Sequence, residues 1–152
     1  MSVNGPMPFP ARIPFGEGLG LELYTFGDGR AEVGLALVET HLNSWGVAHG
    51  GVLMTLLDVA MAHAARSVNI NQPGCGPGVA TIEMKTTFMR AAQGQLRALG
   101  KVLHRTPTMA FCEGSVLDVD GDLCAHGTAT FKYLRALPSK DGAIQDLQRR
   151  AE

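Results

Sequence analysis

One long apolar segment constrains this fold more than any other feature of the sequence. The segment, GGVLMTLLDVAMAHAA at residues 50–65, is interrupted by Asp58 and His63, and it is too short to span a bilayer. It is also too long for one strand, is rich in Leu, Met and Ala, and contains no proline. We therefore predict a helix from His49 to Ser67. Because this helix is apolar nearly all round, protein must enclose it on most sides.

Strand-like runs flank the predicted helix on both sides. On one of them Ala31, Val33, Leu35 and Leu37 alternate with other residues and share one face. The connections between runs, such as GDG at 27–29, are short enough for antiparallel neighbours. A single antiparallel sheet must cover its apolar face, so we predict an α+β fold in which one curved antiparallel sheet wraps around one long central helix. The runs are 19–26, 30–38, 79–90, 95–105, 109–119 and 122–133.

The ends of the chain differ from this central part in composition. Residues 1–18 are rich in Pro and Gly and predict an irregular surface arm. Residues 69–78 predict a loop for the same reason. After Pro138 the tail is polar, and we expect a frayed short helix or disorder there. The sequence thus predicts one domain over residues 19–137, between an arm at 1–18 and a tail at 138–152.

The composition of the chain indicates which classes of binding partner to expect. The formal net charge is −1 and there is no basic block, so nucleic acid is not an expected partner. Only 18% of residues are charged, which is low for a small domain and predicts that a second copy covers part of the surface. Cys75, Cys112 and Cys124 are widely spaced and odd in number, which favours reduced thiols over a disulfide framework or a zinc site. The N-terminal residues lack the apolar core of a signal peptide, so we expect a cytoplasmic protein.

Asp58 is an acid within the apolar helix. A buried carboxylate costs several kcal/mol unless another group satisfies it or a function requires it. A hydroxyl or an amide across the sheet is one explanation. Catalysis is the other, because desolvation raises the pKa of a carboxylate and makes it a better general base or nucleophile.

The residues before and at the helix start are candidates for binding a carbonyl oxygen. Free N–H groups of a first helical turn attract negative charge, and the Gly50 N–H could serve as an oxyanion-hole donor. Gly51 allows a substrate to approach the backbone closely, although a Gly-rich helix entry without chemistry explains the pair equally well. Asn43 either hydrogen-bonds its own loop or holds a reacting carbonyl. His49 either forms the helix entry or fixes the loop through its side chain, and we favour the second.

The spacing of these residues bears on the number of chains in one site. On a helix, Asp58 lies about 180° in azimuth and about 13 Å along the axis from His49. The two side chains of one chain therefore do not easily meet. A two-fold dimer would bring the start of one helix opposite the middle of the other.

Thr81, His63 and the segment DVDGD have ordinary structural explanations. Thr81 suits a strand, although its hydroxyl could orient a water near Asp58. We expect His63 to be a satisfied core or interface histidine. The segment DVDGD at 118–122 is similar to the opening of a calcium loop, but Ala129 stands where that loop requires glutamate, so we predict a hairpin turn.

Three basic residues fall near predicted strand ends. Arg90, His104 and Arg105 most simply remain in solvent there, and they could also bind the phosphates of a large anionic carrier.

In combination, the order of Asn43, His49-Gly50-Gly51 and Asp58 at the head of one helix resembles the hotdog-fold acyl-CoA thioesterases. The closest likeness is to the phenylacetate-degradation (PaaI-like) type of the 4-hydroxybenzoyl-CoA thioesterase superfamily. The segment LNSWGVAHGGVLMTLLDVA carries the motif. The segments ATIEMKTTFMRAAQGQLRALGKVLHR and GDLCAHGTATFKY are similar to later strands of the family, so the likeness covers about residues 19–133.

The resemblance implies hydrolysis of an acyl-CoA, with an apolar or aromatic acyl group, to a free acid and CoA. It implies that Asp58 is the nucleophile or general base and that the Gly50 N–H stabilises the oxyanion. Asn43 and His49 would shape the pocket, and Thr81 would orient Asp58 or the water. The protein would be a homodimer or a dimer of dimers with shared sites, without a metal or redox cofactor.

The resemblance also suggests residues that contact the substrate. Met54 and Met61 would line the pocket between subunits with Gly51, while Arg90, His104 and Arg105 would bind CoA. Two alternative functions on this fold are an enoyl-CoA hydratase or dehydratase and a non-catalytic acyl-CoA sensor. Thr106-Pro107 departs from the family, which often has glycine after the arginine. Because proline cannot donate to a ladder, we expect that edge to bend or stop early.

Overall fold

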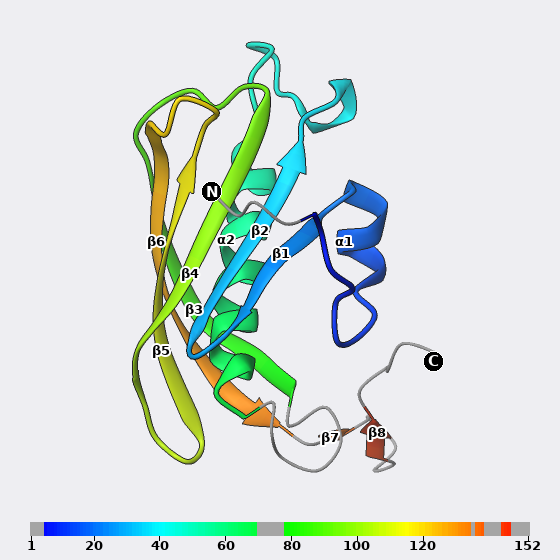
Figure 1. The fold of residues 1–152 in the computed structure, drawn as a ribbon, viewed down its shortest axis with the longest axis vertical. Helices are drawn as coiled ribbons and strands as arrows, with labels where there is room; N and C mark the ends of the chain where they lie inside the picture. The colour runs from blue at the N-terminus through cyan, green and yellow to red at the C-terminus, as the bar shows by residue number, and fades with distance from the viewer. Residues whose placement is uncertain (1–4, 70–77, 135, 139–143, 147–152) are drawn as a thin grey trace.

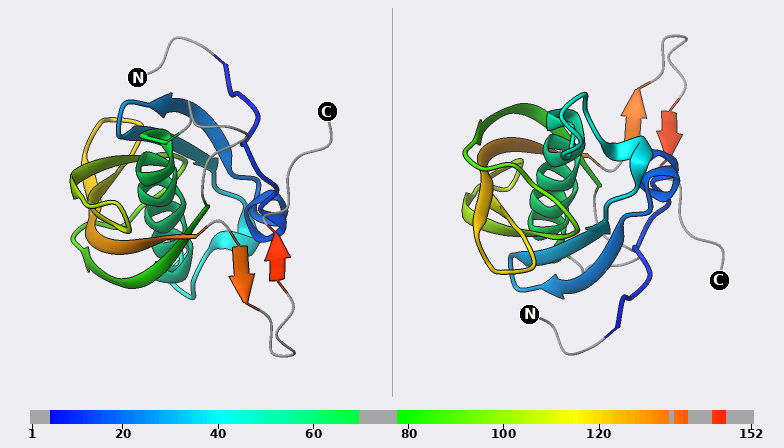
Figure 2. Two further views of the ribbon diagram at one scale, coloured as in Figure 1. Left: turned by 90° about the horizontal axis from the view of Figure 1, so that it is seen from below. Right: turned by 90° about the horizontal axis from the view of Figure 1, so that it is seen from above.

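The computed structural model describes residues 5–69, 78–134, 136–138 and 144–146. One six-stranded sheet, entirely antiparallel, wraps around the long helix α2 (Figures 1 and 2). The strand order is β1-β2-β4-β5-β6-β3, so β1 and β3 form its two edges. The predicted α+β architecture is therefore confirmed. The elements of this layer are β1 (Glu22–Gly27), β2 (Arg30–Ala36), α2 (Gly50–Ser67), β3 (Gly78–Phe88), β4 (Gln95–Arg105), β5 (Met109–Leu117) and β6 (Leu123–Leu134).

Helix α2 packs directly on the sheet through one broad apolar face. A Cβ atom on Gly100 of β4 would lie 2.4 Å from the Ala60 carbonyl oxygen, so only glycine permits the helix backbone to come this close. The opposite stripe of the helix, which includes Met54, Thr55, Asp58 and Ala62, keeps partial exposure. The buried face consists of Leu53, Leu56, Leu57, Ala60, Met61 and Ala64.

Strand β2 confirms the alternation read from the sequence and adds a buried ion pair. Ala31, Val33 and Leu35 lie in the core. Glu32, on the other face of the strand, is only 6% exposed, although the alternation predicts a solvent-facing residue there. Its Oε1 atom accepts a hydrogen bond of 2.7 Å from Nη1 of Arg97 on β4.

The N-terminal arm is more ordered than the sequence predicts. Residues Pro14–Leu19 form the short helix α1, because Pro14 suits a first helical position and Gly20 ends the helix with a φ of 89°. Phe9 is buried against the core, and Met7 forms a bridge to Leu23 of β1. The expectation of an irregular arm is wrong for these residues.

Two further expectations concern the tail and the turn at Pro107. Strands β7 (Ala136–Pro138) and β8 (Ile144–Asp146) pair antiparallel, so a helix at 144–146 is wrong. Pro107 lies in the turn between β4 and β5, and the ladder continues to the pair Arg105 and Ala110. Neither strand is an edge and neither stops early, so those parts of the expectation are wrong. The pairing does shift register between Val102 and His104 of β4. A short 3-10 helix spans Glu39–His41. Most of the predicted loop at 69–78, including Cys75, lies outside the described residues.

Candidate active site

Asp58 faces β3 from the outward stripe of α2. The Thr81 hydroxyl donates a hydrogen bond of 2.7 Å to its Oδ1 atom. Burial raises the pKa of Asp58 above its usual value, and the hydrogen bond from Thr81 opposes this in part. No Lys, Arg or His pairs with Asp58 in the part of the chain that the structure describes. The hydroxyl partner considered from the sequence is thus present, but it leaves the carboxylate desolvated and basic.

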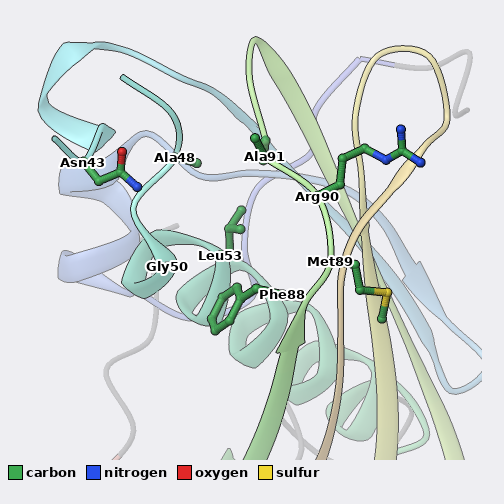
Figure 3. A pocket seen from close by; sticks show the side chains of 9 residues that line it. Asn43, Ala48, Gly50, Leu53, Phe88, Met89, Arg90 and Ala91 are labelled. Carbon is green, nitrogen blue, oxygen red and sulfur yellow. The ribbon is translucent and has the colours of Figure 1, made fainter. Parts of the chain in front are cut away.

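A cavity of about 340 Å³ opens at the start of α2 (Figure 3). Leu53, Ala48 and Ala92 are buried core residues and form its apolar floor. Residues on its rim are more exposed. The complete lining is Asn43, Ala48, Gly50, Leu53, Phe88, Met89, Arg90, Ala91 and Ala92.

Two hydrogen-bond donors on this cavity have no acceptor among the described residues. The Gly51 N–H is used by the helix cap, since it donates to Nδ1 of His49 over 2.9 Å, whereas the Gly50 N–H is free. Oδ1 of Asn43 accepts from the backbone N–H groups of Trp45 and Val47. Its amide nitrogen is directed toward the segment that leads into Gly50 (Figure 3). The cavity therefore presents two free donors to an electron-rich oxygen.

The structure corrects our preference for His49. Its side chain caps the helix through Gly51, and the loop is held instead by Asn43 and by the bond from the His49 N–H to the His41 carbonyl. With Nδ1 occupied as a cap acceptor, His49 acts as the helix-entry residue.

Asp58 and the cavity do not meet within one chain. Asp58 comes eight positions after Gly50 on the helix, which is about 12 Å along the axis, and Asp58 is absent from the lining. The two halves of the predicted site are therefore both present, at separate levels of one helix.

The two predicted methionines have different positions. Met54 lies on the outward stripe with Asp58, but Met61 is fully buried. The sheet covers Met61, because a Cβ atom on Gly114 of β5 would lie 3.1 Å from its Cγ atom. The prediction that Met61 lines a substrate pocket is wrong.

The three basic residues do not gather at one place in this chain. Arg90 lines the cavity and lies 3.6 Å from Asp122 in a loose ion pair. Arg105 donates to Oδ1 of Asn69 over 3.2 Å, just beyond the other end of α2, and the His104 ring stacks on Phe111. The helix between the two ends is about 27 Å long, so His104 and Arg105 lie far from the cavity of their own chain.

Sequence analysis missed the aromatic wall of the cavity. A Cβ atom on Gly50 would lie 3.4 Å from Cζ of Phe88, so the Phe88 ring rests against the glycine whose N–H is free. The contact joins residues that are distant in the sequence. The only sequence signal was the position of Phe88 at the end of the predicted strand 79–90.

Other titratable groups are structural. His63 is buried between Phe9 and Phe26, its Nδ1 atom lies 2.7 Å from the Val59 carbonyl, and burial lowers its pKa to about 4. The expected core position is confirmed, but the Nε2 atom has no hydrogen-bond partner among the described residues, so this histidine is satisfied only at Nδ1. Cys112 and Cys124 are free and buried, and burial raises the pKa of Cys112 to about 12.

The predicted hairpin turn at 118–122 is also confirmed. Oδ1 of Asp118 accepts from the backbone N–H groups of Asp120 and Asp122. Over the described residues, no group of three His, Cys, Asp or Glu side chains could hold a metal ion. No helix in those ranges has the length and apolar character needed to cross a membrane.

Comparison with known proteins gives a consistent result. The family model described as the thioesterase superfamily matches residues 46–125. A protein of Saccharolobus solfataricus named "Putative esterase SSO2140" is 30% identical over 118 residues, which cover 77% of this chain and 81% of that protein.

Solved structures show the same fold. The conserved protein PA5202 of Pseudomonas aeruginosa is 34% identical, with a TM-score of 0.74 over 82% of this chain and 97% of that chain. A mutant of the phenylacetic acid degradation protein PaaI from Thermus thermophilus is 27% identical, with a TM-score of 0.70 over 80% and 100% of the two chains. The hotdog fold predicted from the sequence is confirmed.

Proposed function

Because this chain belongs to the thioesterase superfamily and is a thioester hydrolase, we propose that it hydrolyses acyl-CoA thioesters to a free acid and CoA. This proposal rests on the chemistry of two positions on α2. Asp58 is desolvated and has only a neutral hydroxyl partner, and the free Gly50 N–H borders a cavity with an apolar floor. A base and an oxyanion donor suffice for a thioester, whose carbonyl is already activated.

We propose that each site combines two copies of the chain. The edge strand β3 has no partner on its outer side among the described residues, and such an edge readily pairs with another chain. Antiparallel pairing of β3 with its own copy relates the molecules by a two-fold axis. An axis near Met54, midway between Gly50 and Asp58, brings Asp58 of one copy level with Gly50 of the other.

The reaction then proceeds in two steps. The Asp58 carboxylate takes a proton from water while the water oxygen bonds to the thioester carbon. The negative oxygen that forms accepts hydrogen bonds from the Gly50 N–H and the Asn43 amide. The carbon–sulfur bond then breaks, and the CoA thiolate takes the proton from Asp58. Thr81 positions the carboxylate throughout. If Asp58 instead attacks as a nucleophile, an anhydride forms, and water hydrolyses it after CoA has left.

The surroundings of Asp58 favour hydrolysis over hydratase chemistry. A hydratase needs a histidine base beside the acid, but among the described residues of one chain the Nδ1 atom of His49 caps the helix start and His63 is buried in the core. A CoA substrate and the free, buried thiols of Cys112 and Cys124 fit a cytoplasmic enzyme.

Mixing two inactive variants tests the shared site. Asp58→Asn removes the base. Gly50→Pro removes the N–H and keeps the helix start, because proline suits the first helical position and His49 already has the extended backbone, with ψ of 138°, that precedes proline. Its ring also adds atoms to the cavity beside Phe88. In a mixed dimer one site carries both changes and the other carries neither.

After unfolding and refolding an equal mixture, we expect thiol release from acyl-CoA at about a quarter of the wild-type rate, since half the dimers are mixed and each has one intact site. Each variant alone should be at least about 100-fold slower than wild type. Two inactive variants that stay inactive when mixed would refute the shared site. An active Asp58→Asn protein would refute the proposed chemistry.

A further inference from the structure

We propose that Phe88 determines the length of the acyl group that this enzyme accepts, an inference that rests on the proposed hydrolysis of acyl-CoA. Phe88 is the last residue of β3, and its ring rests against Gly50. It is 50% exposed, although it borders a cavity whose floor is buried. The ring therefore forms the part of the cavity wall that lies beside Gly50 (Figure 3).

The polarity of the cavity fixes the direction in which a substrate lies. A carbonyl oxygen bound at the Gly50 N–H has the acyl carbon on one side and sulfur on the other. The buried floor of Leu53, Ala48 and Ala92 suits an apolar acyl chain. Arg90, exposed on the rim, suits the charged CoA portion. The acyl chain thus points inward past Phe88, and CoA points outward.

The other walls of the cavity are fixed by backbone contacts. The Ala48 N–H donates to the Ala92 carbonyl over 3.0 Å, which joins the loop before α2 to the segment after β3. The N–H groups of Met89 and Arg90 both donate to the Cys124 carbonyl, which holds the end of β3 against β6. Because these backbone hydrogen bonds fix the walls of the cavity, the side chains on those walls determine how deep the cavity is.

The three atoms nearest to a Cβ atom on Gly50 all belong to the Phe88 ring. The cavity of about 340 Å³ lies near the lower limit of the range for small-molecule sites, about 300–1,000 Å³. Removing the ring extends the space beside the reacting carbonyl, and enlarging the ring reduces it. Chain-length preference should therefore follow the size of residue 88 in both directions.

The test compares Phe88→Ala with Phe88→Trp over a series of saturated acyl-CoA substrates from acetyl to palmitoyl. We expect the chain length of highest kcat/KM to increase in Phe88→Ala and to decrease in Phe88→Trp. The ratio of kcat/KM for a long and a short substrate should change by about 10-fold or more, since one methylene in an apolar pocket is worth about 10–200-fold. Opposite shifts exclude a general loss of folding, which would lower all substrates together.

Phe111→Ala is the matched control, because Phe111 is a partly exposed phenylalanine on β5 outside the cavity. It should leave the preference unchanged. Equal losses for every chain length in both Phe88 variants would overturn the inference, because the ring would then only support Gly50.

A second measurement separates this inference from the proposed function. The affinities of non-hydrolysable ketone analogues of the same acyl-CoA series are measured by calorimetry. If the wild type releases no thiol but the affinities still shift in opposite directions, the hydrolase proposal fails and the role of Phe88 stands. If the affinities do not shift, the role of Phe88 fails whether or not thiol is released.

Discussion

Glu32 on β2 is buried and Asp58 on α2 is partly buried, and their surroundings differ. Glu32 lies on the outer face of the sheet and forms an ion pair of 2.7 Å with Arg97. The Arg97 guanidinium in turn lies 3.5 Å from the centre of the Tyr24 ring. Asp58 lies on the helix and receives only the Thr81 hydroxyl. The same functional group is thus neutralised by a cation in one region and left without one in the other.

This difference distinguishes a carboxylate that stabilises the fold from a carboxylate that can act in catalysis. A buried carboxylate with a cation and a stacked ring has its charge satisfied, and removing either partner exposes the other to a desolvation cost. A carboxylate without a cation gains basicity from the same burial. Burial of an acid alone therefore does not identify an active site, whereas the identity of its partners does.

The comparison is tested most severely by Asp58→Asn. We expect kcat for thiol release to fall by about 10²–10⁴-fold, the usual contribution of a general base. The free energy of unfolding at pH 7 should not decrease. Because the folded-state pKa of Asp58 is raised, its stabilising contribution is full below the unfolded pKa and is lost as the pH rises through the folded pKa. Asparagine avoids that loss. Steady-state kinetics and urea denaturation check the two parts, and a large fall in stability would contradict the assignment.

Glu32→Gln should have the opposite profile. We expect the free energy of unfolding to fall by about 3 kcal/mol, at the lower end of the range for breaking a buried pair, because Arg97 retains some solvent contact and its stacking. The kcat value of the folded variant should equal that of the wild type. Urea denaturation with parallel kinetics checks this.

A compensating variant serves as the control for Glu32→Gln. Combining Glu32→Leu with Arg97→Met removes both charges and should recover most of the stability. Loss of activity in Glu32→Gln without loss of stability would instead place Glu32 in the chemistry and remove the distinction between the two acids.

Only one of these two environments could be predicted from the sequence. Asp58 interrupts an apolar helical run, so its burial follows from local periodicity. Glu32 alternates with Ala31 and Val33, so period two predicts that it faces solvent. Its burial depends on Arg97, which is 65 residues away in sequence and which strand pairing alone brings alongside.

The same limit explains the outcome for the site. The helix start, Gly50 and its free N–H follow from sequence order, whereas the approach of Thr81 to Asp58, 23 residues away, was implied only by the resemblance to the family. Met61 was assigned to the pocket wrongly, because helical spacing groups residues on one face of the helix but does not show which part of that face the sheet covers. Phe88 was missed, and His104 and Arg105 were grouped with Arg90, because these relations are set by the pairing of distant strands.

A smaller effect is expected for Thr81→Val, which removes the hydrogen bond to Asp58. That bond lowers the pKa of Asp58, so its loss should raise the pKa further. The acid limb of the kcat/KM profile should then move to higher pH by about one unit, since a hydrogen bond to a charged group is worth about 1.5 kcal/mol or more and one pKa unit is about 1.36 kcal/mol. Thr81→Ser should keep the wild-type profile. A limb that moves to lower pH would show that Thr81 does not act through Asp58.

The smallest effect is expected for Arg97→Lys, which tests what satisfies Glu32. Lysine keeps the positive charge beside Glu32 but loses the planar group that stacks on Tyr24, so the free energy of unfolding should fall by about 1 kcal/mol. This is less than the loss in Glu32→Gln, because no buried carboxylate is left without a cation. Tyr24→Leu should cost a similar amount, and the double variant should cost less than the sum, because both changes remove one contact. If Arg97→Lys costs as much as Glu32→Gln, stacking rather than charge satisfies this region, and the contrast with Asp58 would depend on packing instead of on the cation.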